Sequence, residues 1–391
     1  MSNQNKINLV IDFNNMAMRS MFTCQYMGGG TVKNFDTEEE CTLLIRKLAT
    51  DMCQLVKMFN PYRVFVACDT KFPWRNELYK NMDGMKYKGS RKHDEEKNWT
   101  NIFNALSEYK TILRNNNFVV TEIDHAEADD IAALWVDYAL NHDESVVLVS
   151  SDKDWTQLVS FSSEKKFVAC YNPISNNKNQ KRFYVSQGYM DWINEPDVVD
   201  IFFNGYDETK KLMKDIVTAN SKVVYEVIDP NRVVLDKILC GDDGDDVPAF
   251  YEYYKNGKKM RITPLKASHI LENLSVSSVN GLNEAANSGS LREAVEKEMK
   301  TEVPVDFSER LLRQRKLVEL DKTLFPNKIV EEFNSHVFFM EVYGFVNPNI
   351  KMNDLLKDTK FFDKNFNKPR ENSIFDDVNA LSKFSKAPSL F

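Results

Sequence analysis

Five short apolar segments, separated by helix-like stretches, constrain the fold of this chain most. The first two, Ile7–Asp12 and Tyr62–Asp69, flank an amphipathic helix predicted over Glu38–Phe59, where large apolar residues recur at spacings of three and four. Alternation of this kind predicts an α/β fold, with a mostly parallel central sheet flanked by helices. The other predicted elements are strands near 118–120, 145–150 and 167–170, and helices over 102–113 and from about residue 129.

Carboxylates stand where the predicted strands end. Asp12 and Asp69 close the first two strands, and Glu127–Asp130 and Asp152–Asp154 lie before a predicted helix and after an apolar strand. The carboxyl ends of parallel strands meet at one edge of a sheet, where α/β folds keep their ligands. Like charges gathered there repel one another and raise each other's pKa unless cations lie between them. The pattern therefore predicts a site for hard divalent metal ions.

A structural role is the alternative for these acids. An Asp at the start of a helix caps free amides and complements the helix dipole, which would explain Asp130 and Asp154. Capping does not explain Asp12 or Asp69, because the end of a strand needs no carboxylate. A ligand set of oxygens without histidine favours Mg²⁺, or Mn²⁺, over zinc. Two such ions can hold both oxygens of an in-line phosphoryl transfer, so we expect metal-dependent hydrolysis of a phosphodiester.

Two basic stretches are candidates for binding a polyanion. Residues 71–97 mix cations with aromatic side chains, which suits phosphates and unstacked bases, although a solvated charged loop is the simpler alternative. The second stretch follows the glycine-bounded acidic loop at 241–248. Our candidates for DNA contacts are Lys80, Lys86, Tyr87 and Lys92 in the first stretch and Lys258, Lys259, Arg261 and Lys266 in the second.

Composition limits the cellular context and the domain plan. The 391 residues carry a net charge of −7, which argues mildly against nucleic-acid binding, but local patches decide such binding. Six scattered cysteines, no secretory signal and no membrane-spanning apolar run favour a cytoplasmic protein, in the host cytoplasm if viral, and we expect a monomer. We place a catalytic domain at 1–185 with an arch at 71–97, a helical domain at 186–360 that includes an inserted segment at 186–230, and a tail at 361–391.

Several motifs resemble those of the flap endonucleases and 5′ nucleases. Three segments of this chain look like the three acidic motifs of that family: Glu127–Asp130, Ser151–Asp154 and Gly241–Pro248. Asp12 and Asp69, after the first and second predicted strands, complete the set in the family's order. The pattern is most similar to the ribonuclease H branch found in T-even-type bacteriophages. The likeness to that branch extends to Trp74-Arg75, Tyr87-Lys88-Gly89-Ser90-Arg91 and Arg261-Ile262-Thr263-Pro264-Leu265-Lys266.

The resemblance implies roles for individual residues. Asp12, Asp69, Glu127 and Asp129 would serve the more tightly held of two Mg²⁺ ions. The second ion would be served by Asp152, Asp154 and Asp242, with Asp245 and Asp130 at longer range. The arch cations that grip the scissile phosphate would be Arg75, Lys88 and Arg91.

The resemblance also implies substrates and partners. It implies 5′→3′ exonuclease and flap endonuclease activity on branched or nicked DNA, and removal of RNA primers from RNA–DNA duplexes during DNA replication. The family builds a helix–three-turn–helix motif around the position of Asp242 that holds the backbone of duplex DNA, often with a potassium ion, so the resemblance implies that the helical domain at 186–360 binds duplex DNA. The usual Gly-x-Gly turn is absent here, which argues against K⁺. The tail residues Ile374-Phe375 and Pro388–Phe391 are candidates for binding a sliding clamp or a single-stranded-DNA-binding protein, or are simply an unused tail.

Two other functions fit parts of the pattern. A ribonuclease with a related acidic sheet would act on single-stranded RNA, but it would not need the loop at 241–248 and its basic neighbours. The second is a protein that recognises branched DNA without cutting it. The absence of one of the acidic residues would favour this function, but all of them are present.

Overall fold

The computed structural model describes residues 6–27, 32, 34–80, 85–91, 95–174, 180–194, 222–303 and 307–343. Its centre is an eight-stranded sheet with the order β3-β2-β1-β4-β6-β7-β8, and β5 pairs with β6 beside this path. All pairs from β3 to β6 along this order are parallel, whereas β7 runs antiparallel to β6. The strands are β1 (Ile7–Asp12), β2 (Arg63–Ala67), β3 (Val119–Thr121), β4 (Ser145–Val149), β5 (Ser160–Phe161), β6 (Phe167–Asn172), β7 (Gln180–Val185) and β8 (Lys222–Val227).

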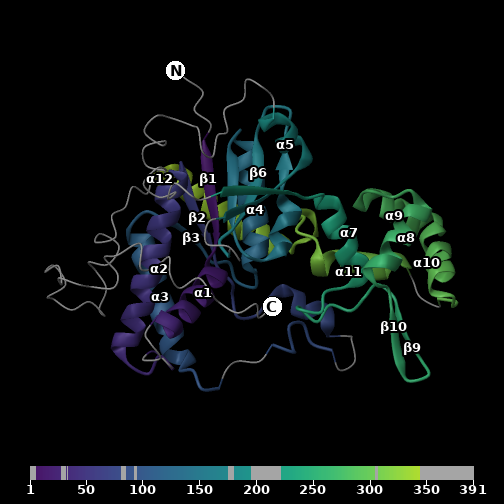
Figure 1. The fold of residues 1–391 in the computed structure, drawn as a ribbon, viewed down its shortest axis with the longest axis horizontal. Coiled ribbons are helices and arrows are strands. Elements are labelled where there is room, and N and C mark those ends of the chain that lie inside the picture. Colours follow the sequence, from purple (N-terminus) through teal and green to yellow (C-terminus); the bar gives the residue numbers. More distant parts are fainter. Residues whose placement is uncertain are drawn as a thin grey trace, which may run out of the picture.

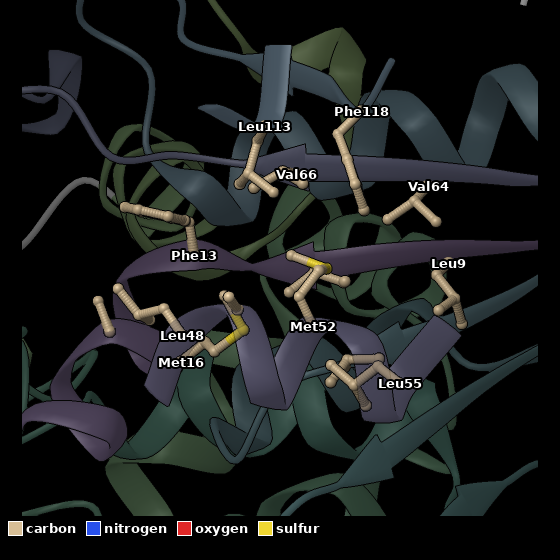
Figure 2. Close-up of a cluster of buried hydrophobic side chains, with 14 of the residues drawn as sticks. Leu9, Phe13, Met16, Leu48, Met52, Leu55, Val64, Val66, Leu113 and Phe118 are labelled. Atoms are coloured by element: carbon tan, nitrogen blue, oxygen red, sulfur yellow. The ribbon is translucent and has the colours of Figure 1, made fainter. Parts of the chain in front are cut away.

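Helices cover both faces of this sheet (Figure 1). Neighbouring residues of β1 point to opposite faces, so Leu9 belongs to one apolar cluster and Val10 to another. Figure 2 shows the first cluster, in which Leu9 and Val64 of the sheet lie with Met52 and Leu55 of a long helix. The first face is covered by α1 (Phe13–Met27), α2 (Glu38–Phe59), α3 (Trp99–Asn115) and α5 (Gln187–Ile193), and the second by α4 (Ala128–Asn141) and α12 (Asn327–Tyr343).

The fold class predicted from the sequence is confirmed. Helix α2 has the predicted bounds, because Thr37 and Glu40 form a capping box at its start and Asn60 ends it in the left-handed region. Helix α1 was not predicted. None of the helices in the described part of the chain is long and apolar enough to cross a membrane.

A helical region with its own apolar core lies beside the sheet (Figure 1). Tyr79 and Tyr87 of the predicted arch pack into this core, so the arch connects the two parts of the molecule. The helical region consists of α7 (Pro230–Cys240), β9 (Glu252–Lys255), β10 (Lys258–Arg261), α8 (Pro264–Leu274), α9 (Val279–Ser288), α10 (Ser290–Met299) and α11 (Phe307–Val318). Three short 3₁₀ helices complete the fold: η1 (Trp74–Tyr79), η2 (Lys153–Leu158) and η3 (Lys322–Leu324).

The chain between the two parts is arranged differently from the predicted domain plan. Residues 222–227 form β8, which pairs in parallel with β7 and so extends the main sheet beyond the boundary predicted near residue 185. Two apolar strand segments far apart in the chain could not be matched from sequence alone, because nothing local fixes their partner. Most of the predicted insertion and all of the predicted tail lie outside the described residues.

Candidate active site at the carboxyl edge of the sheet

Asp12 and Asp69 lie at the edge of the sheet predicted to carry the site. Asp12 ends β1, and its two carboxylate oxygens accept hydrogen bonds from the Asn15 backbone amide at 3.0 Å and the Ser150 hydroxyl at 2.8 Å. Burial, reinforced by the charge of Asp69, raises the pKa of Asp12 to about 7. Asp69 accepts a hydrogen bond at 2.8 Å from the Ala128 amide at the start of α4, and burial also raises its pKa.

Asp129 and Asp152 belong to the same group of acids as Asp12 and Asp69, and we call this group and its neighbouring cations at the carboxyl edge of the sheet the crevice. Burial and the charge of Asp152 raise the pKa of Asp129 well above its usual value, and Asp152 also raises the pKa of Asp12. The indole N–H of Trp155, in η2, donates to the Asp129 carboxylate at 2.5 Å. Trp155 is fully buried, so its indole holds the Asp129 carboxylate in a fixed orientation from the core side. The four carboxylates of Asp12, Asp69, Asp129 and Asp152 are therefore close enough to act on one another, either directly or through a shared neighbour.

Lys88 connects the acidic start of α4 with the glycine-bounded loop. Its ammonium lies 2.5 Å from a Glu127 carboxylate oxygen and 3.5 Å from an Asp245 carboxylate oxygen. Burial opposes the ionisation of Glu127, but the charges of Arg75 and Lys88 outweigh it and lower its pKa. Lys88 is thus a counter-ion in the crevice.

Lys237, on α7, makes a second bridge of the same kind. Its ammonium forms ion pairs with both Asp154 and Asp242, one carboxylate from each part of the molecule. Burial raises the pKa of Asp154 to about 7 even though Lys237 opposes the shift. The sequence analysis did not select Lys237. Its place five residues before Asp242, on the last turns of a helix leading into an acidic loop, was the available signal.

These residues fit a hard divalent cation in their chemistry. All donors are carboxylates, and the pKa values of Asp12, Asp69 and Asp129 are raised by burial and by neighbouring acids, an effect that a bound cation would oppose. In the described part of the chain, however, no three His, Cys, Asp or Glu side chains surround one point as a ready metal cage. Lysine ammonium groups and hydrogen-bond donors hold the carboxylates in pairs.

Arg75 and Asp130 lie elsewhere than their predicted roles require. The Arg75 side chain is 2% exposed, and its guanidinium pairs with Asp130 and Glu127, each at 2.8 Å. It also donates to the Leu317 carbonyl of α11 at 3.1 Å. Asp130 is fully buried and accepts from the Trp74 indole at 3.0 Å and from the Glu127 amide at 3.0 Å. Arg75 is therefore a buried link between the sheet and α11 rather than an exposed arch cation, and Asp130 caps α4.

The other predicted arch residues differ in how far they are buried. Tyr87 is buried and donates to Glu127 at 3.0 Å, so it does not offer a stacking surface for a base. Arg91 pairs with Asp245 and keeps 57% of its side chain exposed. Lys80 pairs with Glu77 in an exposed helical turn, and Lys86 is exposed. Lys92 lies outside the described residues.

Most of the cations predicted to bind DNA in the second basic stretch form ion pairs or hydrogen bonds within the protein. Arg261 forms two hydrogen bonds to Asp243, at 2.5 and 2.7 Å, and Lys259 pairs with Glu252 at 2.9 Å. Lys266 donates to the Arg261 carbonyl at 3.3 Å. Lys258 is exposed, and no ion pair is formed by it within the described residues.

Comparison with known proteins places this geometry in context. No curated protein matches the chain. Among solved structures, the zinc-bound 5′-exonuclease of bacteriophage T5 matches with a TM-score of 0.51 and 16% identity, over 85% of this chain and 99% of that one. The T5 flap endonuclease in a pseudo-enzyme-product complex with DNA and metal ions matches with a TM-score of 0.47 and 15% identity, over 86% of this chain and 100% of that one. The first of these likenesses shows a shared fold.

The family model for the 5′-3′ exonuclease N-terminal, resolvase-like domain matches residues 8–189. That span contains the sheet from β1 to β7 and most of the crevice carboxylates. Residues 8–189 of this chain are therefore similar to the N-terminal, resolvase-like domain of 5′-3′ exonucleases.

Proposed function

We propose that this protein is a Mg²⁺-dependent 5′→3′ exonuclease and flap endonuclease that hydrolyses phosphodiesters of branched or nicked DNA. The observation that carries the proposal is the group of carboxylates at the carboxyl edge of the sheet, where Asp69 and Asp152 raise the pKa of Asp12 and Asp152 raises the pKa of Asp129, within the residues that match a 5′-3′ exonuclease N-terminal domain. The T5 5′-exonuclease, which has a similar fold, binds divalent metal ions in its structure, and the T5 flap endonuclease structure contains DNA and metal ions.

The crevice residues would divide the work. Asp12, Asp69, Asp129 and Asp152 would hold two divalent ions, Mg²⁺ or Mn²⁺. Bound there, such ions lower the pKa of a water molecule and neutralise charge on the phosphate. Asn15, Ser150 and Trp155 hold the Asp12 and Asp129 carboxylates in fixed orientations through the hydrogen bonds described above.

Lys88 and Arg91 are the cations placed to meet a phosphate. Both lie on the described part of the arch against Asp245, and Arg91 is more than half exposed. A phosphate that approaches the crevice would exchange these carboxylate contacts for contacts with its own oxygens. Arg75 is excluded from this role by its burial.

The finer substrate range follows from the resemblance of the sequence motifs. We propose that the protein also removes RNA primers from RNA–DNA duplexes, as the ribonuclease H branch of T-even-type phages does. We also propose that the tail binds a sliding clamp or a single-stranded-DNA-binding protein at the replication fork. The tail residues lie outside the described part of the chain.

The test uses the full chain and a labelled 5′-flap substrate, with Mg²⁺, with Mn²⁺, and with EDTA. We expect cleavage near the junction with either metal and none with the chelator. Cleavage that persists in EDTA would refute the metal mechanism. Tight binding of the flap without cleavage in either metal would favour a protein that binds branched DNA without cutting it.

A matched substrate set then separates the activities. A nicked duplex reports exonuclease activity, and an RNA primer annealed to DNA reports primer removal. Preferential cutting of free single-stranded RNA would favour the single-strand ribonuclease instead.

A further inference from the structure

The short 3₁₀ helix η2 is a place where the crevice and the helical region meet. Asp152 begins this helix and accepts a hydrogen bond from the Asp154 amide at 2.9 Å. Asp154 pairs with Lys237 of α7, and the Trp155 indole holds the Asp129 carboxylate. The helix spans only six residues, and 3₁₀ helices have poorer hydrogen-bond geometry than α-helices. The position of η2 therefore depends on its side-chain contacts.

Gln157, on the same helix, contacts the end of α11 through both polar atoms of its side chain. Its amide nitrogen donates to the Val318 carbonyl at 3.2 Å, and its amide oxygen accepts from the Leu320 backbone amide at 2.8 Å. Val318 is the last residue of α11, whereas Leu320 packs against the second apolar cluster of the sheet. Gln157 therefore binds the chain on both sides of the point where it leaves the helical region.

The same end of α11 is held by one of the cations of the crevice. The last four carbonyls of a helix have no partner within the helix, and Arg75 donates to one of them, that of Leu317, at 3.1 Å. Arg75 also pairs with Glu127. Because α11 and α7 lie between the sheet and α8–α10 (Figure 1), a displacement of α11 reaches the crevice through Arg75 and Gln157. Gln157 is the uncharged member of this pair, so its replacement leaves no buried charge without a partner.

We propose that Gln157 is a positioning residue, which couples the helical region to the crevice by joining the end of α11 to η2. The inference rests on the proposed function and on duplex binding by the helical region, and it adds a control of the metal site by bound duplex. Duplex DNA that holds α11 in one orientation would, through Gln157, hold η2 in one orientation too. Asp152, and Asp129 through Trp155, would then bind metal ions more tightly.

The experiment measures the Mn²⁺ affinity of the full chain by calorimetry, with and without a duplex closed by a hairpin loop at each end. Such a duplex offers no 5′ end, so cleavage does not interfere. Gln157→Met keeps the length of the side chain and removes both hydrogen bonds, whereas Gln157→Glu keeps the accepting oxygen and loses the donor. The control is Asn101→Leu, which removes an amide of α3 that donates to the Phe35 and Asp36 carbonyls.

For the wild-type chain we expect bound duplex to raise the Mn²⁺ affinity about 5-fold or more, because coupling between two sites has this order of magnitude. Gln157→Met should reduce the factor to below about 2-fold, and Gln157→Glu should give a value between the two. Single-turnover cleavage of a 5′ flap should fall about 10-fold in Gln157→Met, since a small misplacement of reacting groups is costly. Affinity for the flap in EDTA should stay at the wild-type value, and the control should retain wild-type coupling and rate.

Urea denaturation of each variant distinguishes this coupling from a purely structural role. A Gln157→Met chain that loses stability but keeps wild-type coupling and cleavage rate would overturn the inference, because Gln157 would then only cap α11. Wild-type coupling in Gln157→Glu would do the same, even if Gln157→Met did not fold. An equal loss of coupling in Asn101→Leu would also overturn it, because general loosening would then be the cause.

These outcomes leave the proposed function intact. A wild-type chain that cleaves the flap but binds Mn²⁺ equally well with and without duplex would likewise overturn only the inference. A wild-type chain that neither cleaves the flap nor binds Mn²⁺ would end the proposed function and the inference together.

Discussion

Two basic stretches of this protein look alike in sequence, but the cations nearest the acidic edge of the sheet and those at the tip of the β9–β10 hairpin differ in their partners. In the stretch from Arg75 to Arg91, Arg75, Lys88 and Arg91 pair with Glu127, Asp130 and Asp245, whereas Lys80 and Lys86 are exposed. In the hairpin, Lys255 and Lys258 at the tip point away from any carboxylate of the described residues. The difference teaches that a run of cations becomes a set of counter-ions or an exposed patch according to which acids the tertiary fold brings to it.

The crevice needs counter-ions because its carboxylates lie close enough to raise the pKa of Asp12 and Asp129. Lys88 and Lys237 each connect an acid of the sheet with an acid of the 241–248 loop. In the absence of a metal these ammonium groups join the two parts of the molecule. The hairpin has no comparable concentration of negative charge to balance.

The largest expected effect separates chemistry from binding. Asp152→Ala removes a carboxylate that acts on both Asp12 and Asp129. We expect at least about a 10³-fold fall in single-turnover cleavage of a 5′ flap, equivalent to about 4 kcal/mol of transition-state stabilisation. Affinity for the uncut flap in EDTA should not fall. Cleavage within 10-fold of wild type would show that the crevice is not the catalytic site.

The next effect tests whether Arg75 is buried structure and Arg91 an exposed cation. Arg75→Ala leaves the buried acids Glu127 and Asp130 without a partner, so we expect a loss of about 3–5 kcal/mol in the free energy of unfolding. Arg91→Ala, at a side chain 57% exposed, should cost less than about 1 kcal/mol. Urea denaturation of both variants measures the difference, and equal losses would contradict the assignment.

A smaller effect tests whether the crevice carboxylates are held for a metal. Trp155→Phe keeps an aromatic ring in the core but removes the N–H that donates to Asp129. We expect Mn²⁺ affinity, measured by calorimetry, to fall about 10- to 100-fold. Trp135→Phe is the matched control, because it removes an equally buried indole N–H that donates to Thr121 at 3.0 Å. A metal affinity unchanged in both variants would remove Trp155 from the site.

The smallest expected effect is on pH dependence. The pKa values of Asp12 and Asp154 are raised to about 7 in the folded protein, from 3.8 as the ordinary value. Their protonated forms therefore stabilise the metal-free fold at low pH, and this stability is lost as the pH rises through 7. In EDTA we expect the free energy of unfolding to fall by about 1 kcal/mol or more between pH 5 and pH 8.

Two comparisons check this pH effect. Asp12→Asn should flatten the profile, and Mg²⁺ should restore stability at pH 8 because the ionised carboxylates then have a cation. A profile that is the same with and without Mg²⁺ would contradict the role of these acids.

Much of the fold could be predicted because its signals are local. Apolar strands and the spacing of three and four in α2 depend on neighbouring residues, and both were read correctly. The pairing of β8 with β7 could not be predicted, because a short apolar strand carries no information about its partner. The positions of Asp12 and Asp69 at one edge followed from parallel pairing alone.

The sequence by itself determined the α/β class and an acidic edge of the sheet, because strand pattern and parallel topology together force the strand ends onto one side. Only the tertiary structure decided that Arg75 is a buried ion-pair partner and that Lys237 bridges two acids. It also left Lys255 and Lys258 without a carboxylate partner in the part of the chain that is described. The physical reason is that the state of a charge depends on burial and on partners distant in the chain. Neither of these is encoded by the residue type or by its neighbours.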